Sequence, residues 1–176
     1  MAKRAFCVGI NDYPYDGSDL NGCVNDARAW SQLLIERFGF AASDVILVTD
    51  AEATKANIMA GLADLLDGAK DGDVLVFTNS SHGSYVADTD ADEPKYDETM
   101  CPYDVAEHQI VDDELRELFQ AVAEDAHVVI IRDNCHSGTV MRAAINENIP
   151  GLRTPDHRRV RFLNPALCGD PVLANP

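Results

Sequence analysis

The stretch "VVIIRDNCHSG", residues 128–138, changes from apolar to polar within a few residues. Its first four residues are β-branched and apolar with no alternation, which is the pattern of a strand that is buried on both faces. Three other short runs share this pattern, at residues 5–10, 45–48 and 74–77. Strands of this kind are typical of a parallel sheet that helices cover on each side.

Helical patterns lie between these apolar runs. Residues 27–38 carry apolar side chains at helical spacing and stop before Gly39, a common helix end. Residues 54–69 repeat the pattern behind Thr54, which we expect to cap the helix, and residues 112–124 repeat it again. This alternation predicts an α/β fold: a three-layer α/β/α sandwich with a mainly parallel sheet in a flavodoxin-like order.

Two segments depart from the alternation. The acidic and polar segment from residue 80 to about 109 is expected to be a long loop, which is usually functional or disordered. After about residue 146 the pattern fades, and five of the eight prolines follow. We therefore predict a folded domain at residues 1–145 and an extended or poorly ordered tail at residues 146–176.

Composition excludes several classes of protein. A length of 176 residues suits a single domain, and a net charge of −16 argues against a general nucleic-acid binder. The five cysteines are odd in number and form no C-x-x-C pair, which argues against a disulfide framework or a structural zinc site. No stretch is long and apolar enough to span a membrane. We expect a cytoplasmic protein.

Polar residues follow two of the predicted strands. His82 and Gly83 come after one strand, and Cys135 comes after another, so we expect them at the same edge of the sheet. A thiol needs a nearby base to become a thiolate, and His82 could serve Cys135 in this way. The backbone N–H groups of Gly83 and Cys135 could then stabilise an oxyanion. A cysteine at a strand end is also a common buried structural residue, so both interpretations stay open.

Six short motifs then point to a family: "VGINDY", "LNGCVNDA", "SSHGS", "DETMCPYD", "IVDDEL" and "DNCHSGT". In this order, over about residues 4–142, they resemble the metacaspases, the caspase-like cysteine peptidases of clan CD. The separation of 53 residues between His82 and Cys135 is near that of caspase-type enzymes. The resemblance implies a caspase-like large catalytic subunit with Cys135 as nucleophile and His82 as general base and acid. We expect His136 to point away from Cys135.

The resemblance also implies an acidic specificity pocket. Its matching positions are Asp26, Ser80 and Asp133. Two carboxylates there would select arginine or lysine before the cleaved bond through charge-assisted hydrogen bonds. Taken singly, Asp26 is also explained as an acid near a helix start, and Asp133 as a strand-end ion-pair partner.

Calcium is a further question, because many metacaspases need it. The matching acidic positions are Asp97, Asp112 and Asp113, and clustered carboxylates suit calcium. Capping of a helix start is a rival explanation for Asp112 and Asp113. A further family aspartate, seven residues after the nucleophile, is Arg142 here. A positive charge there counts against calcium, so we expect that no cofactor is required.

The end of the chain raises two expectations. The sequence stops where the family continues into a small-subunit segment, so we expect an open sheet edge that such a segment, or a second copy, would cover. An arginine cluster would suit self-cleavage by an arginine-specific peptidase: Arg153, Arg158, Arg159 and Arg161. The alternative is a basic tail that packs on an acidic body.

The leading hypothesis is a cysteine endopeptidase whose partners are protein or peptide substrates with arginine or lysine. The first alternative is a catalytically silent caspase-like module that binds or regulates partner proteins. The missing segment supports it, as does Ser81, which stands where the family usually has glycine. The second alternative, a flavodoxin-like nucleotide or flavin binder, lacks a G-x-G-x-x-G loop after the first strand.

Overall fold

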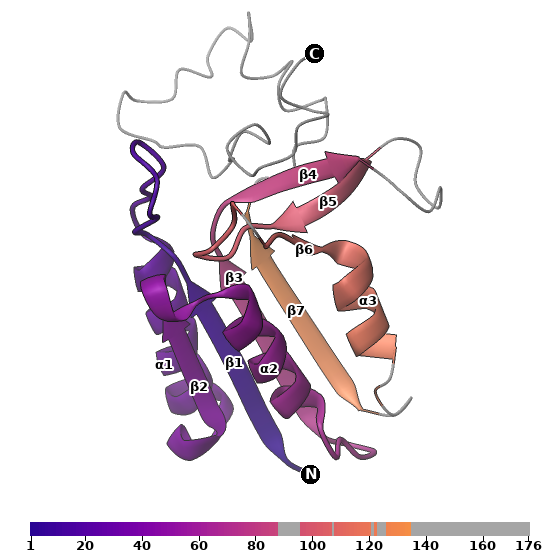
Figure 1. The fold of residues 1–176 in the computed structure, drawn as a ribbon. Helices are drawn as coiled ribbons and strands as arrows, with labels where there is room; N and C mark the ends of the chain where they lie inside the picture. Colours follow the sequence, from indigo (N-terminus) through magenta and orange to yellow (C-terminus); the bar gives the residue numbers. More distant parts are fainter. Residues whose placement is uncertain (88–95, 107, 121, 123–125, 135–176) are drawn as a thin grey trace, which may run out of the picture.

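The computed structural model describes residues 1–87, 96–106, 108–120, 122 and 126–134. Four parallel strands form its main sheet, in the order β2 (Val45–Thr49), β1 (Lys3–Gly9), β3 (Val74–Ser80) and β7 (His127–Asp133). Each predicted apolar run is one of these strands, so the prediction of a parallel sheet is confirmed. Figure 1 shows β2 at one edge of this sheet and β7 at the other.

Helices cover both faces of the sheet (Figure 1). α1 (Cys23–Phe38) lies on one face, and α2 (Lys55–Leu66) and α3 (Asp112–Gln120) lie on the other. Alternate residues of β1 supply the two interfaces: Cys7 packs in the cluster under α1, whereas Phe6 packs in the cluster under α2 and α3. The predicted three-layer sandwich is therefore confirmed.

The helices begin and end close to their local signals. Thr54 accepts a hydrogen bond from the backbone N–H of Asn57 (3.3 Å) and so caps α2 as predicted. Gly39 ends α1 with a φ of 70°, a conformation that favours glycine. α1 starts earlier than predicted, at Cys23. Single turns of 3-10 helix flank β2, at Ala42–Asp44 and Asp50–Glu52.

The long loop predicted from residue 80 to about 109 is wrong over much of its length. A second, antiparallel sheet lies there, with strands in the order β4 (Gly83–Ala87), β5 (Tyr96–Met100) and β6 (Ile110–Val111). Ser84 and Thr99 are both 0% exposed in this sheet. Because polar residues fill buried positions, no apolar run marked these strands in the sequence.

Some expectations fall outside the described residues. The tail predicted at residues 146–176 and the boundary at residue 145 belong to this part of the chain. Among the helices that the structure describes, none combines the length and apolar character needed to cross a lipid bilayer.

Two glycines allow helices to approach the sheet closely. A Cβ atom at Gly61 of α2 would lie 2.4 Å from Cζ of Phe6, so the ring fills the space a side chain would need. At the end of β1, a Cβ atom at Gly9 would lie 2.5 Å from the backbone oxygen of Cys23. The first turn of α1 is thereby held directly against the carboxyl end of β1.

The carboxyl ends of three neighbouring strands are level. Gly9 of β1 pairs with Ser80 of β3, and Ser80 pairs with Asp133 of β7. Residues that follow β3 and β7 therefore leave the sheet at one edge, and open α/β sheets usually carry their sites at this edge.

Candidate active site

His82 lies two residues beyond β3 and is 4% exposed. Its ring nitrogen Nε2 lies 2.6 Å from the backbone carbonyl oxygen of Ser18. Because a carbonyl oxygen only accepts hydrogen bonds, Nε2 carries the proton in the neutral ring and Nδ1 is the basic nitrogen. The Ser18 carbonyl thus holds the imidazole in one tautomer, with Nδ1 as the atom that can receive a proton.

The backbone of His82 is also fixed by hydrogen bonds. Its N–H donates to the Tyr13 hydroxyl (3.2 Å), and that hydroxyl donates to the carbonyl oxygen of Cys101 (2.9 Å). The N–H of Cys101 donates in turn to the carbonyl oxygen of His82 (3.1 Å). Burial raises the pKa of the Tyr13 phenol well above its usual value, so the hydroxyl stays neutral and keeps its proton to donate.

Ser81 fits into the same network. Its hydroxyl donates to the carbonyl oxygen of His82 (3.0 Å) and accepts from Nδ2 of Asn79 (2.9 Å). Ser81 is 0% exposed. The serine that replaces the usual family glycine therefore adds a hydrogen bond that stiffens the turn before His82.

The other predicted catalytic groups are only partly within the described residues. Gly83 begins β4 and pairs with Met100 of β5. Asn134, the residue after β7, is 9% exposed. Cys135, His136 and Arg142 lie outside the described residues. The chain therefore enters the cysteine segment from a strand end that is level with the end of the strand before His82.

A pocket of about 210 Å³ lies between α1 and the carboxyl ends of β3 and β7. The three predicted substrate-binding residues, Asp26, Ser80 and Asp133, all line it. The Ser80 hydroxyl donates to Oδ2 of Asp26 (3.2 Å). Trp30 and Leu33 contribute apolar walls. Two carboxylates beside apolar walls can bind a cationic group at the end of an apolar stem.

Comparisons with known proteins agree with the motifs. A sequence model of the metacaspase, peptidase C14 domain family matches residues 3–144. The chain belongs to the metacaspase family. Metacaspase-7 of Arabidopsis thaliana is 38% identical over 151 residues, which cover 82% of this chain and 37% of that protein. Metacaspase-1 of Cryptococcus neoformans is 39% identical over 149 residues, which cover 79% of this chain and 32% of that protein.

A solved structure confirms the fold. The crystal structure of a protein from Geobacter sulfurreducens matches with a TM-score of 0.73 and 28% sequence identity, over 96% of this chain and 60% of that one. The family resemblance and the caspase-like α/β fold inferred from the motifs are both confirmed. The metacaspase chain spans about a third of the length of the curated relatives it matches.

The acidic residues predicted to bind calcium lie on β5 and in the first turn of α3. Asp97 is 7% exposed on β5, and Asp112 and Asp113 begin α3. Asp113 forms an ion pair with Arg116 one turn along the helix. Within residues 1–87 and the described segments from 96 to 134, no three histidine, cysteine or carboxylate side chains are grouped so that they could hold a metal ion.

The guanidinium of Arg132 on β7 interacts electrostatically with two acids, Glu98 of β5 and Asp112 of α3. Arg132 of β7 has its Nε and Nη2 atoms buried. Burial lowers the pKa of this guanidinium, while the carboxylates of Glu98 and Asp112 raise it. Arg132 thus places a positive charge within electrostatic reach of Asp112, one of the three acids that match calcium positions.

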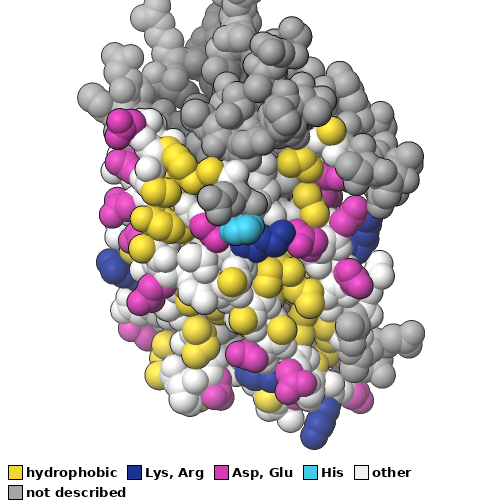
Figure 2. Space-filling model, in the orientation of Figure 1, with side chains coloured by type: hydrophobic (Ala, Val, Ile, Leu, Met, Phe, Trp, Pro, Cys, Tyr) yellow, Lys and Arg dark blue, Asp and Glu magenta, His cyan; other side chains and the backbone are white. Residues whose placement is uncertain are grey.

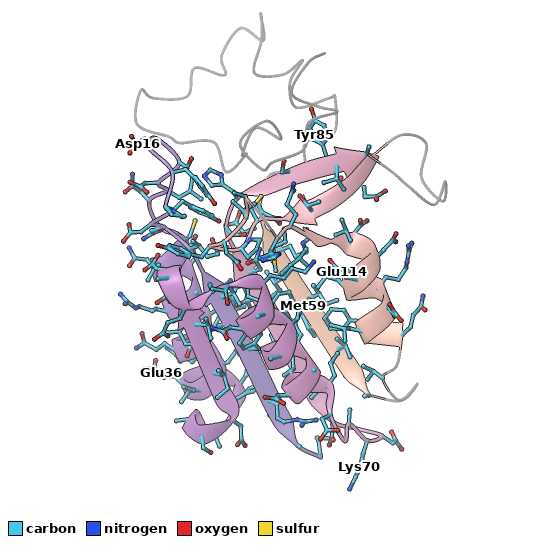
Figure 3. All side chains as sticks on the ribbon, in the orientation of Figure 1. Asp16, Glu36, Met59, Lys70, Tyr85 and Glu114 are labelled. Atoms are coloured by element: carbon cyan, nitrogen blue, oxygen red, sulfur yellow. The ribbon has the colours of Figure 1, made fainter. Side chains whose placement is uncertain are left out.

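Another acid at the start of α3 has a structural partner. Glu114, labelled in Figure 3, accepts a hydrogen bond from Nζ of Lys55 at the start of α2 (2.8 Å). The same Nζ donates to the carbonyl oxygen of Gln109 (2.7 Å). This contact joins α2 to α3, so Glu114 belongs to the packing of the helices.

Two contributors to the site were not predicted. Ser18 acts through its backbone carbonyl, and no side-chain pattern marks such a role. Tyr13 lies inside the "VGINDY" motif, but its bonds to His82 and Cys101 join residues far apart in the sequence. The signal in the sequence was a tyrosine that closely follows the first apolar run, and the structure shows that it is buried.

Proposed function

We propose that this metacaspase chain is the catalytic unit of a cysteine endopeptidase that cleaves peptide bonds after arginine or lysine. One observation carries the proposal: Asp26, Ser80 and Asp133 line one pocket at the sheet edge from which the chain leads to His82. A cationic side chain bound between the two carboxylates would have its backbone near the imidazole. An aspartate side chain would be repelled there.

The proposed chemistry uses Cys135 and His82 as a dyad. The thiol of Cys135 transfers its proton to Nδ1 of His82, and the thiolate attacks the substrate carbonyl carbon. The N–H groups of Gly83 and Cys135 stabilise the oxyanion. The C–N bond then breaks, and the amine leaves with the proton from His82. Water, activated by His82, hydrolyses the thioester and frees Cys135. The Ser18 carbonyl keeps Nε2–H oriented and stabilises the imidazolium throughout.

The test is hydrolysis of fluorogenic peptides that end in arginine, lysine or aspartate. We expect arginine and lysine substrates to be preferred over aspartate on the order of 100-fold, since a like-charge contact costs several kcal/mol. Cys135→Ala and His82→Asn should remove the activity. A preference for aspartate would refute the pocket assignment. A folded wild-type protein that cleaves none of them would favour a silent caspase-like module that binds partners.

We also propose that no calcium is required and that the enzyme is cytoplasmic. Arg132, with Arg142 in the sequence, opposes a calcium site, and the odd number of cysteines with no C-x-x-C pair suits a reducing compartment. The charge of the protein suits basic protein substrates better than nucleic acid, since Figure 2 shows acidic side chains spread over one face. The edge of the sheet beyond β7 is the proposed place for a small-subunit segment or a second copy.

Self-cleavage is a related proposal. The candidate sites lie outside the described residues: Arg153, Arg158, Arg159 and Arg161. Incubation of the active protein should yield fragments that end at one of these arginines, detected by intact-mass measurement. Cys135→Ala protein should stay whole. Equal cleavage of both proteins would show that another protease is responsible.

A further inference from the structure

The pocket that holds Asp26, Ser80 and Asp133 has an aromatic wall. Trp30 lies four residues after Asp26 on α1, so the two side chains leave the same side of the helix, and both line the pocket. Leu33 and Ile131 add to the apolar part of the lining, with two alanines of α1, Ala27 and Ala29. Both carboxylates of this pocket therefore face a space that also exposes an indole.

Arginine and lysine differ in how they use such a wall. A guanidinium is planar, weakly hydrated and able to stack on an aromatic face while its edge donates two parallel hydrogen bonds to a carboxylate. An ammonium is a compact, strongly hydrated point charge that gains less from stacking. A pocket of about 210 Å³ with an indole beside Asp26 thus offers arginine a contact that lysine uses poorly.

We propose that Trp30 is the specificity-determining residue that makes this pocket select arginine over lysine. The inference rests on the proposed function of the pocket and adds to it a side chain that the acidic residues alone do not supply. Asp26 and Asp133 attract either cation. Trp30 discriminates between them by stacking on the guanidinium.

Trp30 also packs against the core cluster under α1, so its removal has a structural effect that must be separated from substrate selection. Trp30→Phe keeps an aromatic face, and Trp30→Leu removes it. Phe38→Leu is the matched control, because Phe38 is an aromatic residue of the same helix that is 55% exposed and does not line the pocket. Thermal unfolding of each variant reports the structural effect.

The kinetic experiment compares kcat/KM for fluorogenic peptides that end in arginine or lysine. Trp30→Leu should lower kcat/KM for arginine by about 3- to 30-fold and leave lysine within about twofold, as expected for loss of a cation–π contact. Trp30→Phe should keep most of the preference, and Phe38→Leu should keep all of it. If Trp30→Leu leaves the ratio of kcat/KM for arginine to kcat/KM for lysine unchanged, the inference is overturned while the proposed function stands.

A binding experiment separates the inference from catalysis. Trp30 is the single tryptophan of the 176 residues, so its fluorescence reports on the pocket. In the Cys135→Ala background, a peptide amide that ends in arginine should change the emission in a saturable way and at lower concentration than its lysine counterpart. If this holds but wild type cleaves neither peptide, the proposed function fails and the inference stands. If neither peptide binds nor is cleaved, both fail.

Discussion

The Tyr13 hydroxyl joins three segments of the chain around His82. It accepts from the His82 N–H and donates to the carbonyl oxygen of Cys101 (3.2 and 2.9 Å). Tyr13→Phe should lower the free energy of unfolding by about 1–3 kcal/mol, because two buried backbone groups lose a partner. It should also lower kcat more than it changes KM, since the hydroxyl fixes His82 and not the pocket.

Urea unfolding and steady-state kinetics check this prediction. Tyr15→Phe is the control, because the Tyr15 hydroxyl accepts a hydrogen bond from the N–H of Ala106 (3.2 Å) rather than from that of His82. If Tyr15→Phe lowers kcat as much as Tyr13→Phe does, the Tyr13 hydroxyl has no special role in orienting His82.

Among single residues, the sequence indicated which side chains line the pocket but not which backbone atoms contact His82. The motifs pointed to Asp26, Ser80 and Asp133, and the structure brings these three into one pocket. The carbonyl of Ser18 was missed, because its role depends on where a loop places the main chain and on nothing in the serine side chain.

Among the elements, α2 depends on a missing side chain for its position over β1. A Cβ atom at Gly61 would lie 2.4 Å from Cζ of Phe6. Overpacking costs about 1–3 kcal/mol, and alanine regains about 1 kcal/mol of helix propensity, so Gly61→Ala should destabilise the protein by up to about 2 kcal/mol. Chemical unfolding measures the change. In a Phe6→Leu background the same substitution should cost less, and an equal cost there would contradict the steric explanation.

The start of β3 is tied to the N-terminus by Asp73. The backbone N–H groups of Ala2 and Lys70 donate to its carboxylate (2.5 and 3.1 Å), and they lower its pKa, the Ala2 bond most. A carboxyl whose pKa is lower in the folded state contributes stability above its unfolded value, about 3.9, and loses it as the pH falls through the folded value.

Asp73→Asn should therefore be less stable than wild type at pH 6, and the difference should shrink at pH 3. Unfolding in urea at the two pH values measures it. Asp71→Asn, at an exposed position two residues before the buried Asp73, is the control and should show little difference at either pH. A difference for Asp73→Asn that is equal at both pH values would exclude the ionised carboxylate as its source.

Elements differed in how well the sequence revealed them. The strands of the main sheet are buried on both faces and form apolar runs, and each was predicted. The sequence predicts a loop where β4 and β5 lie, because Ser84 and Thr99 are polar residues at buried positions. The Thr99 hydroxyl donates a hydrogen bond to the side-chain oxygen of Gln109 (2.6 Å). Hydrophobic periodicity does not mark strands whose buried positions mix polar residues with apolar ones, as Thr99 and Met100 do in β5.

At the scale of the whole molecule, the effect of calcium on thermal stability tests the proposal that no calcium is required. We expect millimolar calcium to shift the Tm of wild type by less than about 1 °C relative to a chelator, whereas a site filled at 100 times its Kd would add about 2.7 kcal/mol. Differential scanning fluorimetry measures the shift. A saturable rise in wild type would contradict the proposal, and a rise confined to Arg132→Gln would identify Arg132 as the group that opposes calcium.

The loop between β1 and α1 positions the backbone carbonyl of Ser18, which forms a hydrogen bond with the His82 ring. The oxygen that orients the imidazole is a main-chain atom, set in place by bonds such as that from the N–H of Leu20 to the carbonyl of Asn11 (2.7 Å). Ser18→Ala should leave that oxygen where it is, whereas one residue inserted between Tyr13 and Ser18 should displace it and break its hydrogen bond to the His82 ring. The contact therefore depends on the number of residues in this loop and not on the identity of residue 18. A comparison that scores only residue identities would not detect this dependence.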